Sequence, residues 1–254
     1  MGMLSGKHAL VTGGGSGIGA AIALALAGEG ARVTIVGRRR EALDAIAAKS
    51  PSIGVVTADV TDEAAVASAF TEATKARGDI SIVVANAGAA ESALFARTTL
   101  DQFERMIAVN LTGVFLTLRE GVRVMAGSSW GRLVVIASIA GLHGHAYAAG
   151  YSAAKHGAVG LTRTLAAETA GTGITVNAVC PGYAATPMLD ESVARIVKKT
   201  GRSEAEARKV LADLNPAGRL VEPQEVADAV LKLCSPGSDG VTGQAIQIAE
   251  GAVA

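Results

Sequence analysis

Seven short apolar runs, separated by longer stretches with helical periodicity, organise this sequence. The runs are rich in Val and Ile, and most of them end at Gly, Asn or Ser. They read HALVTG, RVTIVG, IGVVTADV, ISIVVANAG, GRLVVIAS, GITVNAVCPG and GQAIQIA. Strands that are apolar on both faces and alternate with helices are typical of a parallel sheet with helices on both sides. The sequence therefore predicts the α/β class, with helices over residues 17–28, 64–77, 100–125 and 152–169.

The length of the chain sets how many domains it can form. A βα unit takes about 30 to 40 residues, so about seven strands use up all 254 residues. We therefore expect residues 1–254 to form a single dinucleotide-binding and catalytic domain. Half of the residues are hydrophobic but only 3% are aromatic, so its core must consist of Ala, Val, Leu and Ile.

Charge and cysteine content exclude several kinds of partner. The formal net charge is zero, which gives no basis for binding nucleic acid or an anionic membrane. The apolar run Gly17–Gly28 is too short to cross a bilayer, and the first residues lack a signal-peptide pattern. Cys180 and Cys234 have no metal-ligand spacing. We expect a soluble cytoplasmic protein with reduced cysteines and no metal; a disulfide is the alternative.

One charged segment, DESVARIVKKTGRSEAEARKVLAD at residues 190–213, interrupts the alternation of strands and helices. Its pattern predicts two short amphipathic helices around Gly201. A solvated helical surface is one interpretation. The other is a lid over a pocket, within residues 188–220, because long insertions beside strand ends often carry function.

A glycine-rich loop, VTGGGSGIG, follows the first strand and opens a helix. Free backbone N–H groups and a helix N-terminus at such a turn can bind a phosphate. A tight turn without a ligand is the alternative, but the position at the first βα turn favours a dinucleotide. The residues expected at the phosphates are Gly13, Ser16, Gly17, Ile18 and Gly19.

The spacing T-G-x-x-x-G-I-G resembles that of the short-chain dehydrogenase/reductases, and the resemblance extends over nearly the full chain. It implies a Rossmann-like doubly wound sheet and hydride transfer between a nicotinamide cofactor and a ketone or secondary alcohol. It also implies a homotetramer, formed through residues 111–125 and 158–167 and the last strand. The chain has Glu250 and Gly251 where the family often has V-D-G-G.

The end of the second strand bears on which nucleotide binds. NAD-binding relatives usually have a carboxylate there for the ribose 2′-hydroxyl, but this chain has Gly37, followed by Arg38 and Arg39. An arginine can bind a 2′-phosphate, so we favour NADP(H), with NAD(H) as the alternative. Arg38 is the leading contact. Ser16 stands where many NADP-using relatives have a further basic residue.

Other matches to the family extend the expected nucleotide site. Asp59 and Val60 resemble its adenine clamp. ANAG, which contains Asn86 and Gly88, resembles its adenosine-side motif. The loop expected at the nicotinamide contains Pro181, Gly182 and Thr186.

A tyrosine and a lysine stand four residues apart in AAGYSAAKHG. At this spacing Tyr151 and Lys155 share one face of a helix. The ammonium favours the phenolate, so we expect Lys155 to lower the pKa of Tyr151. Such a phenol can exchange a proton with a carbonyl or alcohol oxygen.

The resemblance adds two residues to this pair. Ser138 matches the family's substrate-orienting serine, and Asn110 matches its asparagine that holds a helix backbone and a water. Lys155 would also bind the nicotinamide ribose. Tyr147 is not the acid, because Tyr151 and not a lysine follows it four residues later.

The substrate is the least constrained prediction. We expect its pocket between residues 139–147, 89–95 and the loop from Tyr183, where His143 and His145 are loop residues or polar contacts. The chain resembles 3-oxoacyl-thioester reductases and polyketide ketoreductases. The insertion contains four basic residues: Arg195, Lys198, Lys199 and Arg202. They bind a coenzyme A or carrier-bound substrate, or else they form ion pairs with acidic residues on the surface.

Three functions remain open at this point. The first is an NADPH-dependent reductase of a ketone, such as a 3-oxoacyl thioester. The second is an NAD-dependent secondary alcohol or hydroxyacyl dehydrogenase that works oxidatively. The third is a nucleotide-binding regulator.

Overall fold

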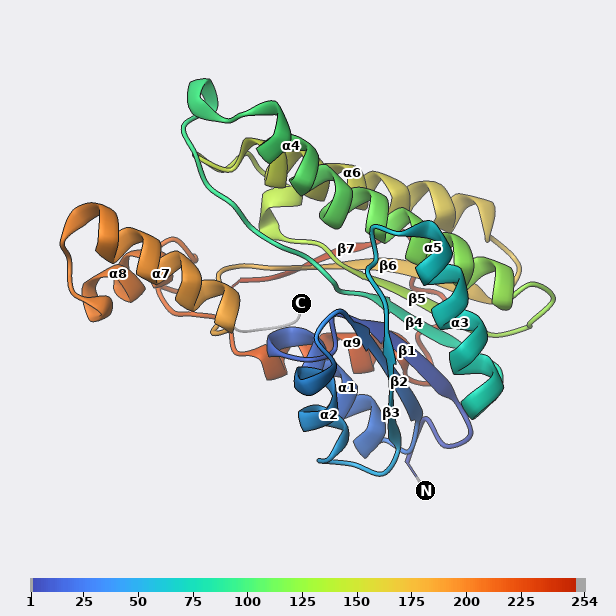
Figure 1. Cartoon of the computed structure of the whole chain (residues 1–254). Coiled ribbons are helices and arrows are strands. Elements are labelled where there is room, and N and C mark those ends of the chain that lie inside the picture. The colour runs from blue at the N-terminus through green and yellow to red at the C-terminus, as the bar shows by residue number, and fades with distance from the viewer. Residues whose placement is uncertain (1, 250–254) are drawn as a thin grey trace.

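A computed structural model describes residues 2–249. Seven strands form one parallel sheet in the order β3-β2-β1-β4-β5-β6-β7 (Figure 1). The strands are β1 (His8–Thr12), β2 (Arg32–Gly37), β3 (Ile53–Thr57), β4 (Ile82–Ala85), β5 (Gly131–Ile136), β6 (Ile174–Pro181) and β7 (Ala245–Ile248). Each of the seven apolar runs thus forms a strand, and the predicted doubly wound sheet is confirmed.

Helices cover both faces of the sheet (Figure 1). One face carries α1 (Gly17–Gly28), α2 (Arg40–Ala47) and α9 (Pro223–Cys234). The other carries α3 (Glu63–Arg77), α5 (Gly113–Val124) and α6 (Ala149–Glu168). Helix α1 is apolar all round because it packs against both the sheet and the neighbouring helix α9, with Ile22 and Leu26 fully buried. Within the described residues, no helix is both long and apolar enough to span a membrane.

The helix predicted over residues 100–125 is interrupted. It consists of α4 (Leu100–Ile107), a π-helical segment (Ala108–Thr112) and α5. In a π-helix each carbonyl accepts from the residue five positions later, which loosens the α-helical pairing. The side-chain Nδ2 of Asn110 donates to the carbonyl of Met106, four residues earlier, at 3.1 Å. The sequence carried no signal for this insertion.

Helix α6 begins at Ala149, three residues before the predicted start at Ser152. Tyr151 therefore lies in the first turn of the helix, and Lys155 lies one turn later. The predicted departure from the family pattern at Glu250 and Gly251 lies outside the described residues.

The charged insertion forms the two predicted helices, α7 (Pro187–Thr200) and α8 (Glu204–Ala212), which extend from the body of the molecule as an arm (Figure 1). Gly201 ends α7 in the left-handed conformation, with φ of 71°, which glycine adopts at low cost. Ser203 starts α8 with a capping box to Glu206. The arm also buries Leu189 against Leu211, so it has its own apolar centre.

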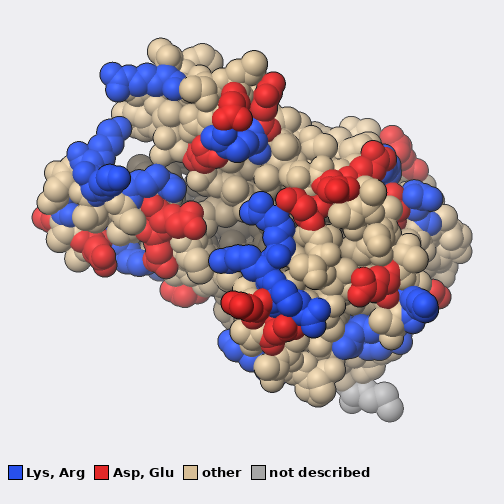
Figure 2. Space-filling model, viewed as in Figure 1, with Lys and Arg blue, Asp and Glu red and all other residues tan. Residues whose placement is uncertain are grey.

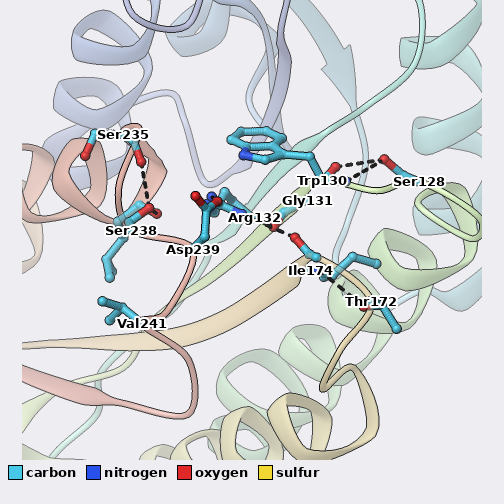
Figure 3. A network of polar contacts seen from close by, with 12 residues as sticks. Ser128, Trp130, Gly131, Arg132, Thr172, Ile174, Ser235, Ser238, Asp239 and Val241 are labelled. Atoms are coloured by element: carbon cyan, nitrogen blue, oxygen red, sulfur yellow. Dashed lines mark hydrogen bonds and ion pairs between the residues drawn. The ribbon is translucent and has the colours of Figure 1, made fainter.

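The amino ends of the central strands are joined by a buried arginine. Arg132 of β5 is fully buried, and its guanidinium donates to Asp239, which precedes β7 (Figure 3). It also donates to the carbonyls of Gly131 at 2.9 Å and Gly173 at 3.4 Å. The Trp130 ring lies 4.3 Å from the guanidinium carbon. One side chain thus connects three segments that are far apart in the sequence.

Candidate active site

A cavity of about 800 Å³ opens at the carboxyl ends of the strands. Strand order reverses there, with β2 and β4 on either side of β1, and open α/β sheets bind ligands at such a point. Every predicted site residue lies on its wall. They are Gly13, Ser16, Gly17, Ile18, Gly19, Arg38, Arg39, Asp59, Val60, Asn86, Gly88, Asn110, Ser138, Tyr151, Lys155, Pro181, Gly182 and Thr186.

Asn86 holds the glycine loop in place. Its Nδ2 donates to the carbonyls of Thr12 at 2.9 Å and Gly13 at 3.2 Å. A Cβ atom at Gly13 would lie 2.8 Å from this nitrogen, and one at Gly19 would lie closer still. Gly13 also has a positive φ of 68°. These glycines are therefore required by packing against Asn86, and the Asn86 amide supports the loop.

The start of α1 fits a phosphate group. Ser16 is the N-cap residue, but its side chain makes no capping hydrogen bond, so the first N–H groups of the helix lack that partner. Gly17 has a φ of 52°, and a Cβ atom there would lie 3.1 Å from Cγ2 of Thr186 across the cavity. Backbone thus lines the narrow part, as a dinucleotide pyrophosphate requires. The residues present fit a nicotinamide dinucleotide.

The nucleotide end of the cavity carries positive charge. Gly37 ends β2, and the Arg38 side chain that follows is 73% exposed, with Nη1 3.7 Å from Oδ2 of Asp59. Asp59 is held mainly by Thr61, whose backbone N–H and hydroxyl donate to Oδ1 at 3.0 and 2.8 Å. These hydrogen bonds, more than Arg38, lower the pKa of Asp59. Arg38 is thus largely exposed at the cavity wall, with one contact of 3.7 Å to Asp59.

Ser138, Tyr151 and Lys155 meet on the opposite wall. Ser138 follows β5, and its Oγ accepts a hydrogen bond from the Ala140 N–H at 3.1 Å. The Nζ of Lys155 is buried and donates to the Ile136 carbonyl at 2.9 Å, and it lies 5.6 Å from the Tyr151 ring centre. Burial lowers the pKa of Lys155 to about 8.

The expected lowering of the Tyr151 pKa is not found. Burial raises the pKa of Tyr151 above its ordinary value, and a hydrogen bond with Ser138 opposes this only in part. The prediction from the helical spacing was wrong because it counted the charge of Lys155 but not the loss of water around the phenol.

Asn110 connects the π-helical segment to the cavity wall. It is fully buried, and its Nδ2 donates to the Ala89 carbonyl at 2.9 Å while its Oδ1 accepts from the Ala89 N–H at 3.3 Å. A Cβ atom on Gly88 would lie 2.9 Å from this Oδ1. Asn110 thus holds the loop that follows β4 in place, and the same side chain also donates to the Met106 carbonyl.

Only one of the two candidate histidines lines the substrate end of the cavity. His145 lies on the cavity wall with its ring 6.4 Å from that of Tyr183, whereas His143 does not line the cavity. Burial lowers the pKa of His145, which favours the neutral ring. Tyr147 also lines this end, with a positive φ of 67°, and its carbonyl accepts from Ala93 N–H at 2.9 Å.

Tyr183 lines the substrate end of the cavity, as predicted for the loop that begins with it. Nothing in the sequence indicated its contact with His145, because the two residues belong to different loops. Sequence reasoning missed Val109 as a wall residue, although it directly precedes the predicted Asn110.

Comparisons with known proteins agree with this geometry. A model of the short chain dehydrogenase family matches residues 7–197. The chain is 37% identical over 246 residues to D-beta-hydroxybutyrate dehydrogenase of Cupriavidus necator, with 95% of each chain covered. It is 37% identical over 250 residues to the 3-oxoacyl-(acyl-carrier-protein) reductase FabG of Aquifex aeolicus, with 96% of each covered.

The fold is also that of a solved polyketide ketoreductase. A variant of actinorhodin polyketide ketoreductase with NADPH matches with a TM-score of 0.93 and 36% identity, over 99% of this chain and 98% of that chain. The predicted resemblance is confirmed, and the regulator alternative gives way to an enzyme. This chain belongs to the short-chain dehydrogenase family and is an NAD(P)-dependent oxidoreductase that acts on CH–OH or keto groups.

Proposed function

We propose that this protein reduces a ketone with NADPH and that Tyr151 supplies the proton. The observation that carries the proposal is the placement of Ser138, Tyr151 and Lys155 on one wall of the cavity that also contains the glycine loop. A substrate carbonyl can reach the phenol from the same space in which a dinucleotide fits.

Each residue has a distinct part in this reaction. The nicotinamide, when bound, supplies the hydride. Tyr151 donates its hydroxyl proton to the carbonyl oxygen, and Ser138 donates a hydrogen bond that orients the same oxygen. Burial raises the pKa of Tyr151, which keeps the phenol protonated and ready to act as the acid. The Lys155 ammonium lies nearby to stabilise the phenolate that remains and to bind the ribose.

Substitution Tyr151→Phe tests this proposal, because it removes the acidic proton and keeps the ring. We expect ketone reduction to fall by at least about 100-fold, as for loss of a general acid. NADPH affinity, measured by fluorescence titration, should stay within about twofold of the wild type. Retention of most of the activity would contradict the role of Tyr151.

NADPH is the proposed nucleotide because Gly37 stands where NAD-binding relatives carry an acid, and Arg38, the next residue, lines the cavity. The NADPH bound to the solved ketoreductase supports the same choice. NAD-linked oxidation of an alcohol is the second candidate, favoured by the similarity to a hydroxybutyrate dehydrogenase. A 3-oxoacyl thioester is the proposed substrate type, by analogy with the FabG relative.

Three wider proposals accompany this function. Residues 188–220 act as a lid, since α7 and α8 both contribute to the cavity wall. A homotetramer is supported by exposed apolar residues within the predicted interface range 111–125, namely Phe115 and Val124, and light scattering tests it. Two free, buried cysteines are compatible with the proposed cytoplasmic location.

A further inference from the structure

Two cations of the arm face the substrate end of the cavity. Arg195 and Lys199 lie one turn apart on α7, and both line the cavity that contains Tyr151. Figure 2 shows Lys and Arg side chains along the edge of the α7–α8 arm that faces the hollow between the arm and the body.

Ion pairs within the arm leave these two cations largely available. Nη1 of Arg195 lies 4.0 Å from Oε2 of Glu191, at the limit of an ion pair, and both side chains are exposed. Its Nη2 donates to the Ser192 hydroxyl at 2.8 Å. Lys199 makes no ion pair or side-chain hydrogen bond within residues 2–249.

Two other acids of the arm have partners of their own. Asp190 of α7 pairs with Arg208 of α8, and Asp213 pairs with Lys209 at 2.9 Å. Of the two cations on the cavity wall, the alternative of ordinary surface ion pairing therefore applies to Arg195, through its 4.0 Å contact with Glu191, but not to Lys199.

The one carboxylate that lines the substrate end, among the described residues, is neutralised by an arginine. The Arg105 Nε and Nη2 donate to the two carboxylate oxygens of Glu91, each at 3.0 Å. This pairing holds the pKa of Glu91 below its usual range. The remaining side chains there include Leu94, Tyr183 and Met188. The substrate end therefore combines an apolar surface with an excess of positive charge.

We infer that Arg195 and Lys199 form a subsite for an oxyanion that the substrate carries at a distance from its keto group. This inference rests on the proposed ketone reduction, because Tyr151 fixes where the keto group lies. The apolar wall contacts the carbon chain between the two ends, and the cations bind the charged end. A carboxylate of a free keto acid and the phosphates of a coenzyme A thioester share this chemistry.

Paired substrates that differ only in charge test the subsite. The keto acid 5-oxohexanoate is compared with its methyl ester, and acetoacetyl-coenzyme A with the acetoacetyl thioester of N-acetylcysteamine. The enzyme variants are Arg195→Gln, Lys199→Gln and the double substitution. Lys198→Gln is the matched control, since this exposed neighbour on α7 does not line the cavity.

We expect the double variant to lose about tenfold in kcat/KM, mostly through KM, for the anionic member of one pair. The neutral member of that pair, NADPH affinity and the Lys198→Gln variant should change by less than about twofold. The pair that responds identifies the source of the oxyanion. Equal losses on both members of each pair, or no loss on either anion, would overturn the inference.

A binding measurement keeps this test separate from the proposed reaction. Calorimetry with the NADP⁺-loaded protein measures the dissociation constants of glutarate and of coenzyme A, which have no keto group. Binding of either ligand that weakens about tenfold in the double variant supports the subsite even when turnover is absent. If neither ligand binds, the subsite is refuted, whereas full activity of Tyr151→Phe refutes only the proposed function.

Discussion

Lys155 shows how much a single buried charge costs the folded protein. Its pKa falls from 10.5 to about 8 in the folded protein because burial disfavours the ammonium. Between these two values the unfolded chain binds more protons than the folded one, so stability rises with pH across that interval. Below pH 8 the lysine is charged in both states, and the full cost of burying the charge is present. The protein thus retains a destabilising residue in its candidate active site.

Substitution Lys155→Met removes this cost and should raise the free energy of unfolding at pH 7 by about 1–3 kcal/mol. The advantage should shrink as the pH rises from 8 to 10.5, where the wild-type lysine loses its proton. Urea denaturation at pH 7 and at pH 10 measures both effects, with the exposed Lys198→Met as the control. An unchanged or lower stability at pH 7 would show that the Ile136 contact outweighs burial.

Arg38 should affect the binding of NADPH but not that of NADH. Substitution Arg38→Ser should weaken NADPH binding by about 10- to 100-fold, the worth of a lost hydrogen bond between charged groups. NADH affinity should change by less than about threefold, because NADH has no 2′-phosphate. Arg40→Ser is the matched control, since Arg40 pairs with Asp44 at 2.9 Å and does not line the cavity. Equal losses for both nucleotides would contradict a 2′-phosphate contact.

Residue spacing predicted the Tyr151–Lys155 pair because two side chains one helical turn apart must share a face. The spacing did not predict the pKa of either group. That property depends on burial and on Ser138 and Cys180, which belong to other segments.

At the scale of elements, helix α5 packs on the sheet through a glycine. A Cβ atom at Gly121 would lie 2.9 Å from Cδ2 of Leu133 on β5 and 3.3 Å from Cγ2 of Val83 on β4. The helix has no side chain of its own at this position, so its backbone lies directly on the side chains of Leu133 and Val83. This contact sets the distance between the sheet and α5, the helix that follows the π-helical segment with Asn110.

Substitution Gly121→Ala should therefore lower the free energy of unfolding by about 1–3 kcal/mol, because the buried side chains of Leu133 and Val83 would have to shift within a packed core. Its control is Gly28→Ala at the end of α1, where a Cβ atom meets nothing within 4 Å. The control should be neutral or slightly stabilising. A Gly121→Ala protein as stable as the wild type in urea would show that α5 can shift away from the sheet.

The elements themselves were largely predictable, since a strand or helix reflects the pattern of its own residues. All seven strands and both helices of the arm follow from apolar runs, charge and the break at Gly201. The π-helical segment was not predictable, because AVNLT has no distinguishing pattern. Its Asn110 side chain bonds to Ala89, which only the folded chain brings near.

At the scale of the whole molecule, Arg132 joins strands that the sequence keeps far apart. Its guanidinium is fully buried at the amino end of β5, and Asp239, 68% exposed, supplies the opposite charge (Figure 3). Removing one partner of a buried ion pair leaves the other charge without compensation. The contact thus links the central sheet to the segment that leads into β7.

Substitution Asp239→Asn should lower the free energy of unfolding by about 1–3 kcal/mol, since the buried guanidinium then faces a neutral amide. Asp213→Asn on the arm is the control, because its exposed pair with Lys209 should contribute less than about 1 kcal/mol. Urea denaturation of both variants measures the difference. Equal stabilities would mean that water compensates Arg132 as well as Asp239 does.

The sequence by itself determined the order and type of the elements, the position of the glycine loop and the pairing of Tyr151 with Lys155. These features depend on residues within a few positions of one another. Their periodicity and spacing can be read from the sequence without knowledge of the tertiary contacts. Only the tertiary structure decided the direction of the Tyr151 pKa, the support of the loop by Asn86 and the available charge of Lys199. Each of these depends on burial or on contacts between distant segments. Water leaves the side chains, and residues far apart in the sequence come into contact, only after the sheet has assembled.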